Sequence, residues 1–460
     1  MVDYRIEHGL VLTCENGLIG GAMYADGAVA VTGDTITMVG KTEDVRKVHP
    51  DARRVIDAGG KIVMPGFIIT HTHMTYVLGH NQPVDFSQLR SFWDMLQKMG
   101  WEWLEDITTR DGIYAATRYA AAKMLRNGTT TVCELVEGPN ALPGPLSANA
   151  KAVSEIGIRA QIGYEVTERV PGVSILERLE RSMAEKGFEE NIAFLEKYPP
   201  ASRGLIRGRL GVHTAYTNSR ETLKKARSIA DKYGCGIQIH IAEIPRAFLV
   251  EKYGKSAPQL LEEVGLLGPD VVAAHCIDLT DEDLEILRRN KVNVAHTPMT
   301  NSLGGNGVAR VPEMLGKGMN VTIGHDCFFT LDTAEYIRYA SLVHKAHNAN
   351  PMLIPTFQAV DMATLNAAKA LGVSDQIGSL AAGKKGDLIV IDPDSPTPVV
   401  PESVVSYFSM TFRGCDVDTV MVDGRIVVEG KKLLTGDEDE IRGLCVEEAR
   451  KLWRRTGVKV

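Results

Sequence analysis

The chain has 460 residues, of which 44% are hydrophobic and 24% are charged, the composition of a globular protein with a sizeable core. Its 51 Lys and Arg against 58 Asp and Glu give a net charge of −7, which argues against a nucleic-acid-binding protein because such proteins carry a basic surface. No run approaches the roughly 18 apolar residues of a membrane span, and the N-terminus lacks the basic and apolar regions of a signal peptide.

The cysteines indicate the compartment. The chain has seven of them, widely spread and without a CxxC pair. Unpaired thiols of this kind are typical of a reducing environment. We therefore expect a cytoplasmic protein with neither nucleic acid nor membrane as a partner.

The first 66 residues are rich in short β runs. GAVAVTGDTITMVG and RVIDAGGKIVMPG alternate apolar and polar residues and are broken by Gly and Asp turns. This pattern predicts β-hairpins rather than helices.

From residue 67 to about residue 371, eight β-rich runs alternate with segments of helical periodicity, such as 220–233 and 281–290. The eight runs are 67–73, 129–135, 158–165, 209–214, 236–242, 271–276, 292–296 and 320–326. From the fourth run onward their ends lie roughly 20 to 35 residues apart, the length of one strand–helix unit. The pattern predicts an α/β fold, a TIM-like (β/α)8 barrel domain over residues 67–375, in which the long connection 74–128 covers the site.

Residues 378–433 return to the pattern of the N-terminus. GSLAAGKKGDLIVIDPD and VDTVMVDGRIVVEGKK are again β runs separated by Gly and Asp turns. We therefore expect residues 1–66 and 376–460 to form one composite domain, a small β-sandwich built from both termini. Residues 438–453 predict a charged helix at the end of the chain.

Ionisable side chains stand at the ends of the predicted barrel strands, where all strands of a parallel barrel converge on one face. Seven of the twelve histidines lie there: His71, His73, His213, His240, His275, His296 and His325. A single one would be read as an ordinary core or surface histidine, but so many at the same end of successive strands indicate a shared site. Together with Asp326 such imidazoles can bind a divalent transition metal ion, most simply Zn²⁺. His296 and His325 either line the pocket or support a ligand.

These segments resemble the amidohydrolase superfamily over nearly the whole chain. The resemblance is carried by MPGFIITHTH (64–73), IHIAE (239–243), AHCIDLTDEDL (274–284), VAHTPMTN (294–301), IGHD (323–326) and the exit segment 370–392. Within the superfamily the chain is most similar to the cytosine-deaminase-like group. That group includes deaminases of methylthioadenosine and S-adenosylhomocysteine, guanine deaminases and s-triazine chlorohydrolases.

The resemblance implies one divalent metal ion, zinc or alternatively iron, held by His71, His73, His240 and Asp326. It also implies Glu243 and His275 as catalytic partners. Binuclear relatives bridge two ions through a carboxylated lysine at the end of strand four. The corresponding segment GRLGVHTAY (208–216) has no lysine, so a single ion is expected.

The chain departs from the family at three points. His213 occupies the place of the deaminases' substrate-binding histidine, but the two prolines of that motif are absent. Ile69 stands where Asp or Asn is usual, and His325 stands where Thr or Ser is commoner. These changes leave the expected metal ligands intact, but they leave the identity of the substrate open.

The residue types suggest a mechanism. A divalent metal lowers the pKa of bound water to about 7. Asp326 can accept the water's proton, while a protonated Glu243 gives its proton to a ring nitrogen and then to the departing amine. His275 can stabilise the oxygen of the tetrahedral intermediate. The alternative for Glu243 is a glutamate at a helix start.

We therefore expect a metal-dependent aminohydrolase that replaces an exocyclic amine of a nitrogen heterocycle with oxygen and releases ammonia. The preferred substrates are adenine nucleosides such as methylthioadenosine, S-adenosylhomocysteine or deoxyadenosine. The alternatives are dechlorination or dealkylamination of s-triazines and deamination of guanine or a pterin. A non-catalytic scaffold is disfavoured because the ligand set is complete. Homo-oligomerisation is expected from the family resemblance.

The first long loop is the expected substrate-binding segment. It carries Trp93 and Trp101, together with Phe86, Phe92 and Trp103. These rings can either stack on a flat heterocycle or pack the loop against the barrel. Asp94 and Glu102 are candidates for the acid that related nucleoside deaminases use to bind ribose hydroxyls.

A thiol nucleophile is disfavoured. Cys276 and Cys327 each follow an expected site residue, but successive residues of a strand point to opposite faces. The other type of zinc deaminase requires PCxxC, which the chain lacks.

Overall fold

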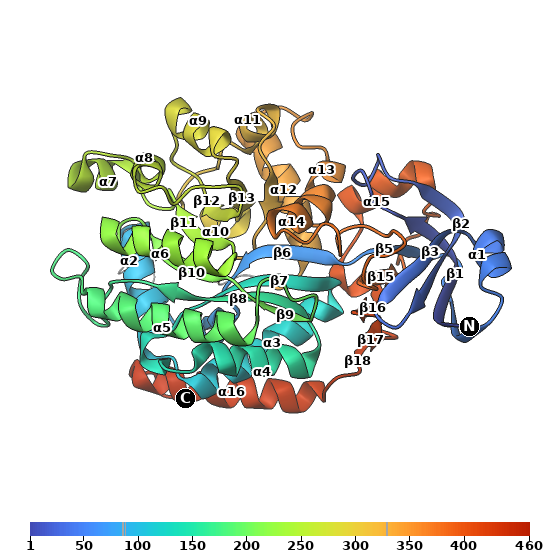
Figure 1. The fold of residues 1–460 in the computed structure, drawn as a ribbon, viewed down its shortest axis with the longest axis horizontal. Helices are drawn as coiled ribbons and strands as arrows, with labels where there is room; N and C mark the ends of the chain where they lie inside the picture. Colours follow the sequence, from blue (N-terminus) through green and yellow to red (C-terminus); the bar gives the residue numbers. More distant parts are fainter. Residues whose placement is uncertain (85–86, 88, 328–329) are drawn as a thin grey trace.

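The computed structural model describes residues 1–84, 87, 89–327 and 330–460 (Figure 1). Its central unit is a barrel of eight parallel strands: β6 (Phe67–Thr72), β7 (Thr129–Val136), β8 (Arg159–Val166), β10 (Leu210–Thr214), β11 (Ile237–Ile241), β12 (Val271–His275), β13 (Asn293–His296) and β14 (Val321–Ile323). Neighbours in the barrel follow chain order, and a parallel bridge between Thr72 and Asp326 brings the last strand back to the first. The predicted strands are confirmed, with ends that differ by three residues at most.

Burial explains why these short runs form strands. Every residue of the eight strands is buried, as expected for a parallel sheet covered by helices on its outer face and filled by side chains inside. One short strand, β9 (Ile206–Gly208), was not predicted from the sequence; it pairs with β8.

Helices cover the outside of the barrel (Figure 1). The α-helices between and after its strands are α2 (Phe92–Met95), α3 (Arg110–Arg126), α4 (Pro145–Ile156), α5 (Arg181–Lys197), α6 (Arg220–Tyr233), α7 (Arg246–Tyr253), α8 (Ala257–Glu263), α9 (Asp281–Arg289), α10 (Pro298–Leu303), α11 (Val311–Gly316), α12 (Thr333–His347), α13 (Thr356–Met362) and α14 (Leu365–Ala370). Both helices predicted by periodicity, α6 and α9, are confirmed. The start of α9 is fixed by a capping box between Thr280 and Asp283, and α6 ends at Gly234, whose φ of 62° is left-handed.

The two termini build a second β unit, as predicted. Its nine strands are β1 (Val2–Leu12), β2 (Met23–Thr32), β3 (Thr35–Lys41), β4 (Ala52–Asp57), β5 (Ile62–Pro65), β15 (Leu388–Ile391), β16 (Val417–Val422), β17 (Arg425–Glu429) and β18 (Lys432–Leu433). They are joined in one hydrogen-bonded sheet, in which C-terminal β15 pairs with N-terminal β5. Apolar residues from both ends of the chain, such as Ile6, Val31 and Met421, share one core inside this sheet. Figure 1 shows the N-terminal strands in blue beside the C-terminal strands in red.

Three helices belong to the flanks. They are α1 (Thr42–Val48), α15 (Val404–Met410) and α16 (Glu438–Arg455). The predicted C-terminal helix is confirmed as α16, and it packs on α3 of the barrel, where Arg126 pairs with Glu438 at 2.7 Å. The domain boundaries at residues 66 and 376 stay a prediction. Among the described residues, no helix is both long and apolar enough to cross a membrane.

A buried ion pair joins the barrel to the terminal sheet. Arg159, at the start of β8, donates two parallel hydrogen bonds of 2.7 and 2.9 Å to Asp387 and a third of 2.8 Å to Asp423. The two carboxylates outweigh the effect of burial and raise the pKa of this guanidinium. The first residue of a barrel strand is therefore anchored to one end of the antiparallel pair β15–β16, where Asp387 precedes β15 and Asp423 follows β16.

We expect Arg159→Gln to lower the free energy of unfolding by about 3 to 5 kcal/mol, because it leaves buried Asp387 without its counter-charge. Arg203→Gln is the matched control, since Arg203 and its partner Asp375 are both more than half exposed and an exposed pair contributes about 0 to 1 kcal/mol. Urea unfolding of both variants measures the difference. Equal stabilities of the two variants would contradict the anchoring role of Arg159.

Candidate active site

Five of the predicted site residues meet at the C-terminal ends of the barrel strands. His71 lies near the end of β6 and His73 just after it, His240 lies in β11, His275 ends β12 and Asp326 follows β14. All five are buried. Ligand atoms of His71, His240, His275 and Asp326 lie within 4.8 Å of one another, and His73 faces two of these residues. The convergence expected from the sequence is therefore observed.

The hydrogen bonds of His73 and His240 orient both rings toward one point. Their Nδ1 atoms donate to main-chain oxygens, His73 to Leu135 at 2.9 Å and His240 to His213 at 3.0 Å. In a neutral imidazole this leaves a lone pair on Nε2. The two Nε2 atoms face each other at 3.1 Å, so a cation between them would bind the lone pairs of both neutral rings. This donor set fits a divalent metal ion.

Asp326 contributes a carboxylate to this cluster. Its Oδ1 lies 3.2 Å from His71 Nε2 and 3.7 Å from His73 Nε2. Burial alone would raise the pKa of Asp326, but the neighbouring His275 and the hydrogen bond from His71 outweigh burial and lower it. Burial lowers the pKa of His71 to about 4. An ionised carboxylate beside a neutral imidazole is the protonation state in which both groups bind metal.

Backbone conformation at the strand ends aims these side chains. Ala242, His275, Cys276 and Asp326 have positive φ angles of 53°, 71°, 52° and 62°. Such angles are unfavourable for residues other than glycine and cluster at functional sites, where the surrounding structure enforces them. His71 also accepts main-chain hydrogen bonds from His325 and Asp326. The barrel is thus closed by the backbone of its own site residues.

Glu243 and His275 lie side by side next to the cluster. Glu243 Oε1 is 3.7 Å from His275 Nε2, while His275 Nδ1 is held 3.0 Å from both Asn301 Oδ1 and Thr297 Oγ1. Burial raises the pKa of Glu243, against an opposing effect from His275. Glu243 therefore keeps its proton to a higher pH than an exposed glutamate and can act as a proton donor.

Aromatic residues of the first loop lie over the barrel mouth. Trp101, which is 3% exposed, packs edge-on to Trp93 at 5.6 Å and to His213 at 5.8 Å between ring centroids. Trp93 also contacts Tyr216 and Phe248. The loop therefore reaches the expected substrate-binding histidine. Phe86 lies outside the described residues.

The structure adds a buried ionic group that the sequence did not single out. Arg169 follows β8 and donates to Glu105 at 2.7 Å and to Asp106 at 2.6 Å, with its guanidinium 4.6 Å from the Trp101 ring centroid. Glu105 also accepts a 2.6 Å hydrogen bond from Tyr76, whose ring lies 5.4 Å from that of His73.

Among the described acids of the first loop, Glu105 and Asp106 are buried, and Glu105 also contacts Tyr76 beside His73. Glu102 is exposed, and Asp94 accepts from the main chain of Arg90. Glu165, at the end of β8, was also missed as a candidate. Its Oε1 lies 3.6 Å from His213 Nε2, and it groups with His73 and His240. The only sequence signal for Glu165 was its position at a strand end.

The remaining histidines and cysteines of the strand ends have other partners. His296 Nε2 faces His344 at 3.1 Å, and His325 bonds Thr333 at 3.1 Å and stacks on Tyr336. Both belong to the layer that supports the cluster. Burial raises the pKa of the Cys276 and Cys327 thiols, the opposite of what a nucleophilic cysteine needs.

Comparison with known proteins agrees with this architecture. A 5'-deoxyadenosine deaminase of Methanosarcina acetivorans is 34% identical over 457 residues, which cover 98% of this chain and 97% of the relative. A 5-methylthioadenosine/S-adenosylhomocysteine deaminase of Moorella thermoacetica is 34% identical over 442 residues, covering 94% and 96%. The crystal structure of a zinc-complexed atrazine chlorohydrolase from Arthrobacter aurescens superimposes with a TM-score of 0.84 at 21% identity, covering 97% of this chain and 100% of that one.

The family model described as the amidohydrolase family matches residues 62–427, which include the whole barrel and the site residues at its mouth. Its match and the full-length relatives lead to the same assignment. This chain belongs to the amidohydrolase family.

Proposed function

We propose that this protein is a metal-dependent aminohydrolase that converts the exocyclic amine of an adenine nucleoside to an oxygen, consuming water and releasing ammonia. The observation that carries the proposal is the buried cluster of imidazoles and one carboxylate with the carboxyl group of Glu243 beside it. The two relatives described above are named as deaminases of 5'-modified adenine nucleosides.

The ion would be held by His71, His73, His240 and Asp326, and zinc suits this set of nitrogen and oxygen donors. The two Nε2 atoms that face each other at 3.1 Å in the cluster support this assignment. When bound, a divalent ion lowers the pKa of water and supplies a nucleophile at neutral pH. His275 is as close to the cluster as a ligand, but its Nε2 also faces Glu243, so we assign it to catalysis.

The protein's own residues then move the protons. Asp326, ionised and buried, accepts the proton of the attacking water. Glu243 begins protonated, gives its proton to the ring nitrogen next to the reacting carbon, and recovers one to pass on to the leaving amine as the C–N bond breaks. His275, fixed through its Nδ1, directs Nε2 toward the oxygen that gains negative charge.

We assign recognition of the nucleoside to residues at the mouth of the barrel. Trp101, Trp93 and His213 contact one another beside the cluster, and their rings are suited to stack on a flat base and to form hydrogen bonds with it. Burial and the nearby Arg169 lower the pKa of His213, which keeps it a neutral partner for a base. The carboxylate of Glu105 is the nearby acceptor suited to ribose hydroxyl groups.

Glu105→Gln should raise KM for nucleosides by about tenfold or more with a smaller change in kcat, because a neutral amide binds hydroxyl donors less strongly than a carboxylate does. The control is Asp106→Asn. Asp106 also pairs with Arg169 but has no hydrogen bond to Tyr76. Steady-state kinetics with an adenine nucleoside compares the two variants. If both raise KM equally, Glu105 acts only by holding Arg169.

Ammonia release from a panel of substrates tests the function itself. The panel contains 5'-deoxyadenosine, methylthioadenosine, S-adenosylhomocysteine, adenine, guanine, a pterin and an aminated chlorotriazine. We expect the highest kcat/KM with the 5'-modified adenine nucleosides. Preferential release of chloride or alkylamine from the triazine, or preferred guanine or pterin turnover, would favour the alternative chemistries of this site. No turnover by metal-loaded protein would favour a scaffold.

The compartment and the oligomeric state of the enzyme are also proposals. All seven cysteines are free and most are buried, which suits a reducing cytoplasm. A homo-oligomer is expected from the family. Gel filtration with light scattering measures the oligomeric state, and a monomer would contradict it.

A further inference from the structure

A cavity lies at the opposite end of the barrel from the candidate active site. It has a volume of about 550 Å³ and is lined by residues at the starts of β10, β11 and β12, at the end of α6 and after α14. Gly236, which precedes β11, lines it, whereas His240 near the other end of β11 belongs to the metal cluster. Because a strand rises about 3.3 Å per residue, the two sites are more than about 10 Å apart.

The cavity is positively charged. Its lining contains four cationic side chains and two acidic ones: Arg207, Arg209, Arg227, Lys369, Asp231 and Asp270. Both acids are bound to Arg227, Asp231 at 2.7 Å and Asp270 at 2.9 Å. The two acids therefore share one arginine, and Arg207, Arg209 and Lys369 are further cations in the lining.

Arg207 and Arg209 remain as uncompensated charges. They are 8% and 4% exposed, and neither has a carboxylate within 4.0 Å in the part of the chain that the structure describes. Buried charges are normally paired, since removing an ion from water without a partner is costly. Burial and the nearby Arg159 accordingly lower the pKa of Arg207.

The two guanidinium groups also have donors to spare. Arg209 bonds Gln161 Oε1 at 3.0 Å and the main-chain oxygens of Ile237 and Asp270 at 3.0 and 2.7 Å, but its buried Nε has no acceptor. Arg207 donates from one nitrogen to Gln376. Since a guanidinium carries five N–H donors, Arg207 keeps four for a ligand in the cavity.

We propose that this cavity is a binding site for a small phosphorylated molecule. A phosphate monoester carries about −1.5 to −2 charges at pH 7, which matches the two uncompensated guanidinium groups. Planar guanidinium groups bind phosphate oxygens with two parallel hydrogen bonds. Pro200, Cys235 and Leu371 give the cavity an apolar wall for the rest of the molecule, and its volume is that of a typical small-molecule site.

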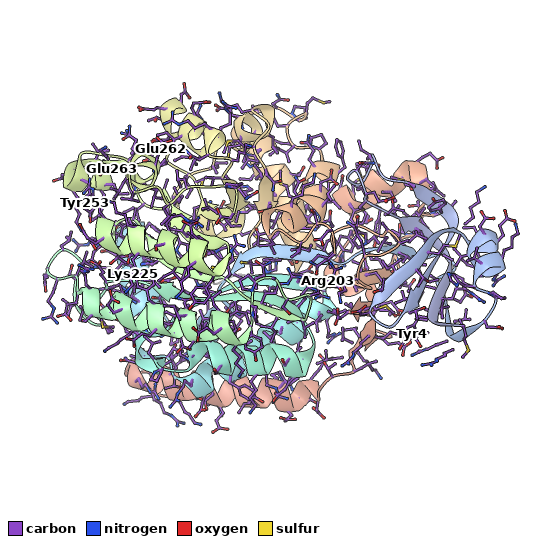
Figure 2. The ribbon with its side chains drawn as sticks, viewed as in Figure 1. Tyr4, Arg203, Lys225, Tyr253, Glu262 and Glu263 are labelled. Carbon is purple, nitrogen blue, oxygen red and sulfur yellow. The ribbon has the colours of Figure 1, made fainter. Side chains whose placement is uncertain are left out.

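Isothermal titration calorimetry with inorganic phosphate tests the proposal on the metal-loaded protein at constant ionic strength. We expect saturable binding of one phosphate per chain, and at least a tenfold loss of affinity in Arg207→Gln. Arg203→Gln is the control and should bind as the wild type does. Arg203 is an exposed arginine close to β9, paired with Asp375 rather than placed in the cavity (Figure 2).

Three outcomes would overturn the proposal. The first is that the wild type shows no saturable binding. The second is that Arg207→Gln binds phosphate unchanged, which would place the phosphate elsewhere, such as on the metal ion. The third is that acetate binds as tightly as phosphate. If Arg207→Gln does not fold, Lys369→Gln replaces it. Lys369 is exposed at the rim, and its loss should weaken phosphate binding by about threefold; unchanged binding would count against the proposal.

Discussion

Glu243→Gln should lower kcat by about 10²- to 10⁴-fold while the metal content stays unchanged. The substitution keeps the shape of the side chain but removes the proton that the carboxyl group transfers. Glu243 is buried beside His275 and outside the proposed ligand set, so its loss should affect turnover rather than metal binding. Steady-state kinetics together with metal analysis of the same preparation measures both effects.

The matched control for this variant is Glu251→Gln. Glu251 lies on the exposed side of α7, eight residues further along the same segment. It should retain wild-type kcat. Near-normal turnover in Glu243→Gln would refute the proton-transfer role, and loss of the metal in that variant would show that Glu243 is a ligand instead.

Removal of the metal ion should abolish activity and lower the melting temperature. The ligands are buried and come from separate strands at the C-terminal end of the barrel, so the ion binds the folded chain and not the unfolded one. An ion at 1,000 times its Kd stabilises the folded state by about 4 kcal/mol. Incubation with a chelator, followed by thermal unfolding and assay, measures both quantities, and one equivalent of Zn²⁺ should restore them.

The change in melting temperature distinguishes removal of the metal ion from direct inhibition of the enzyme by the chelator. The melting temperature of Glu243→Gln should fall on chelation by the same amount as that of the wild type, because its ligand set is intact. Full activity after exhaustive chelation, with no metal left on the protein, would contradict metal-dependent hydrolysis.

The barrel could be predicted from the sequence because its strands are short, fully buried and separated by helices. Short β-rich runs, most of them ending in a polar or ionisable residue, located all eight strands. The extra strand β9 was missed because its three residues, Ile206–Gly208, are too few to show a periodic pattern; they pair with the first half of β8. Pairing between β5 and β15 joins segments more than 300 residues apart, and only the similar patterns of the two termini suggested it.

The site could be predicted in part. The ends of parallel strands converge at the barrel mouth, so several histidines and an aspartate at these ends indicated a shared site, and His71, His240 and Asp326 were identifiable in this way. Arg169 and Glu105 were not, because they lie in loops, where sequence position does not fix the direction of a side chain. Their pairing depends on how the first long loop folds over β8, and no periodic pattern encodes that contact.

The most direct test of the metal centre is the metal content of the protein as purified, compared with that of His73→Ala and His275→Ala. We expect about one divalent ion per chain in the wild type, almost none in His73→Ala, and an undiminished content with little turnover in His275→Ala. A wild-type protein without stoichiometric metal would contradict the proposed centre, and loss of the ion from His275→Ala alone would reassign its ligands.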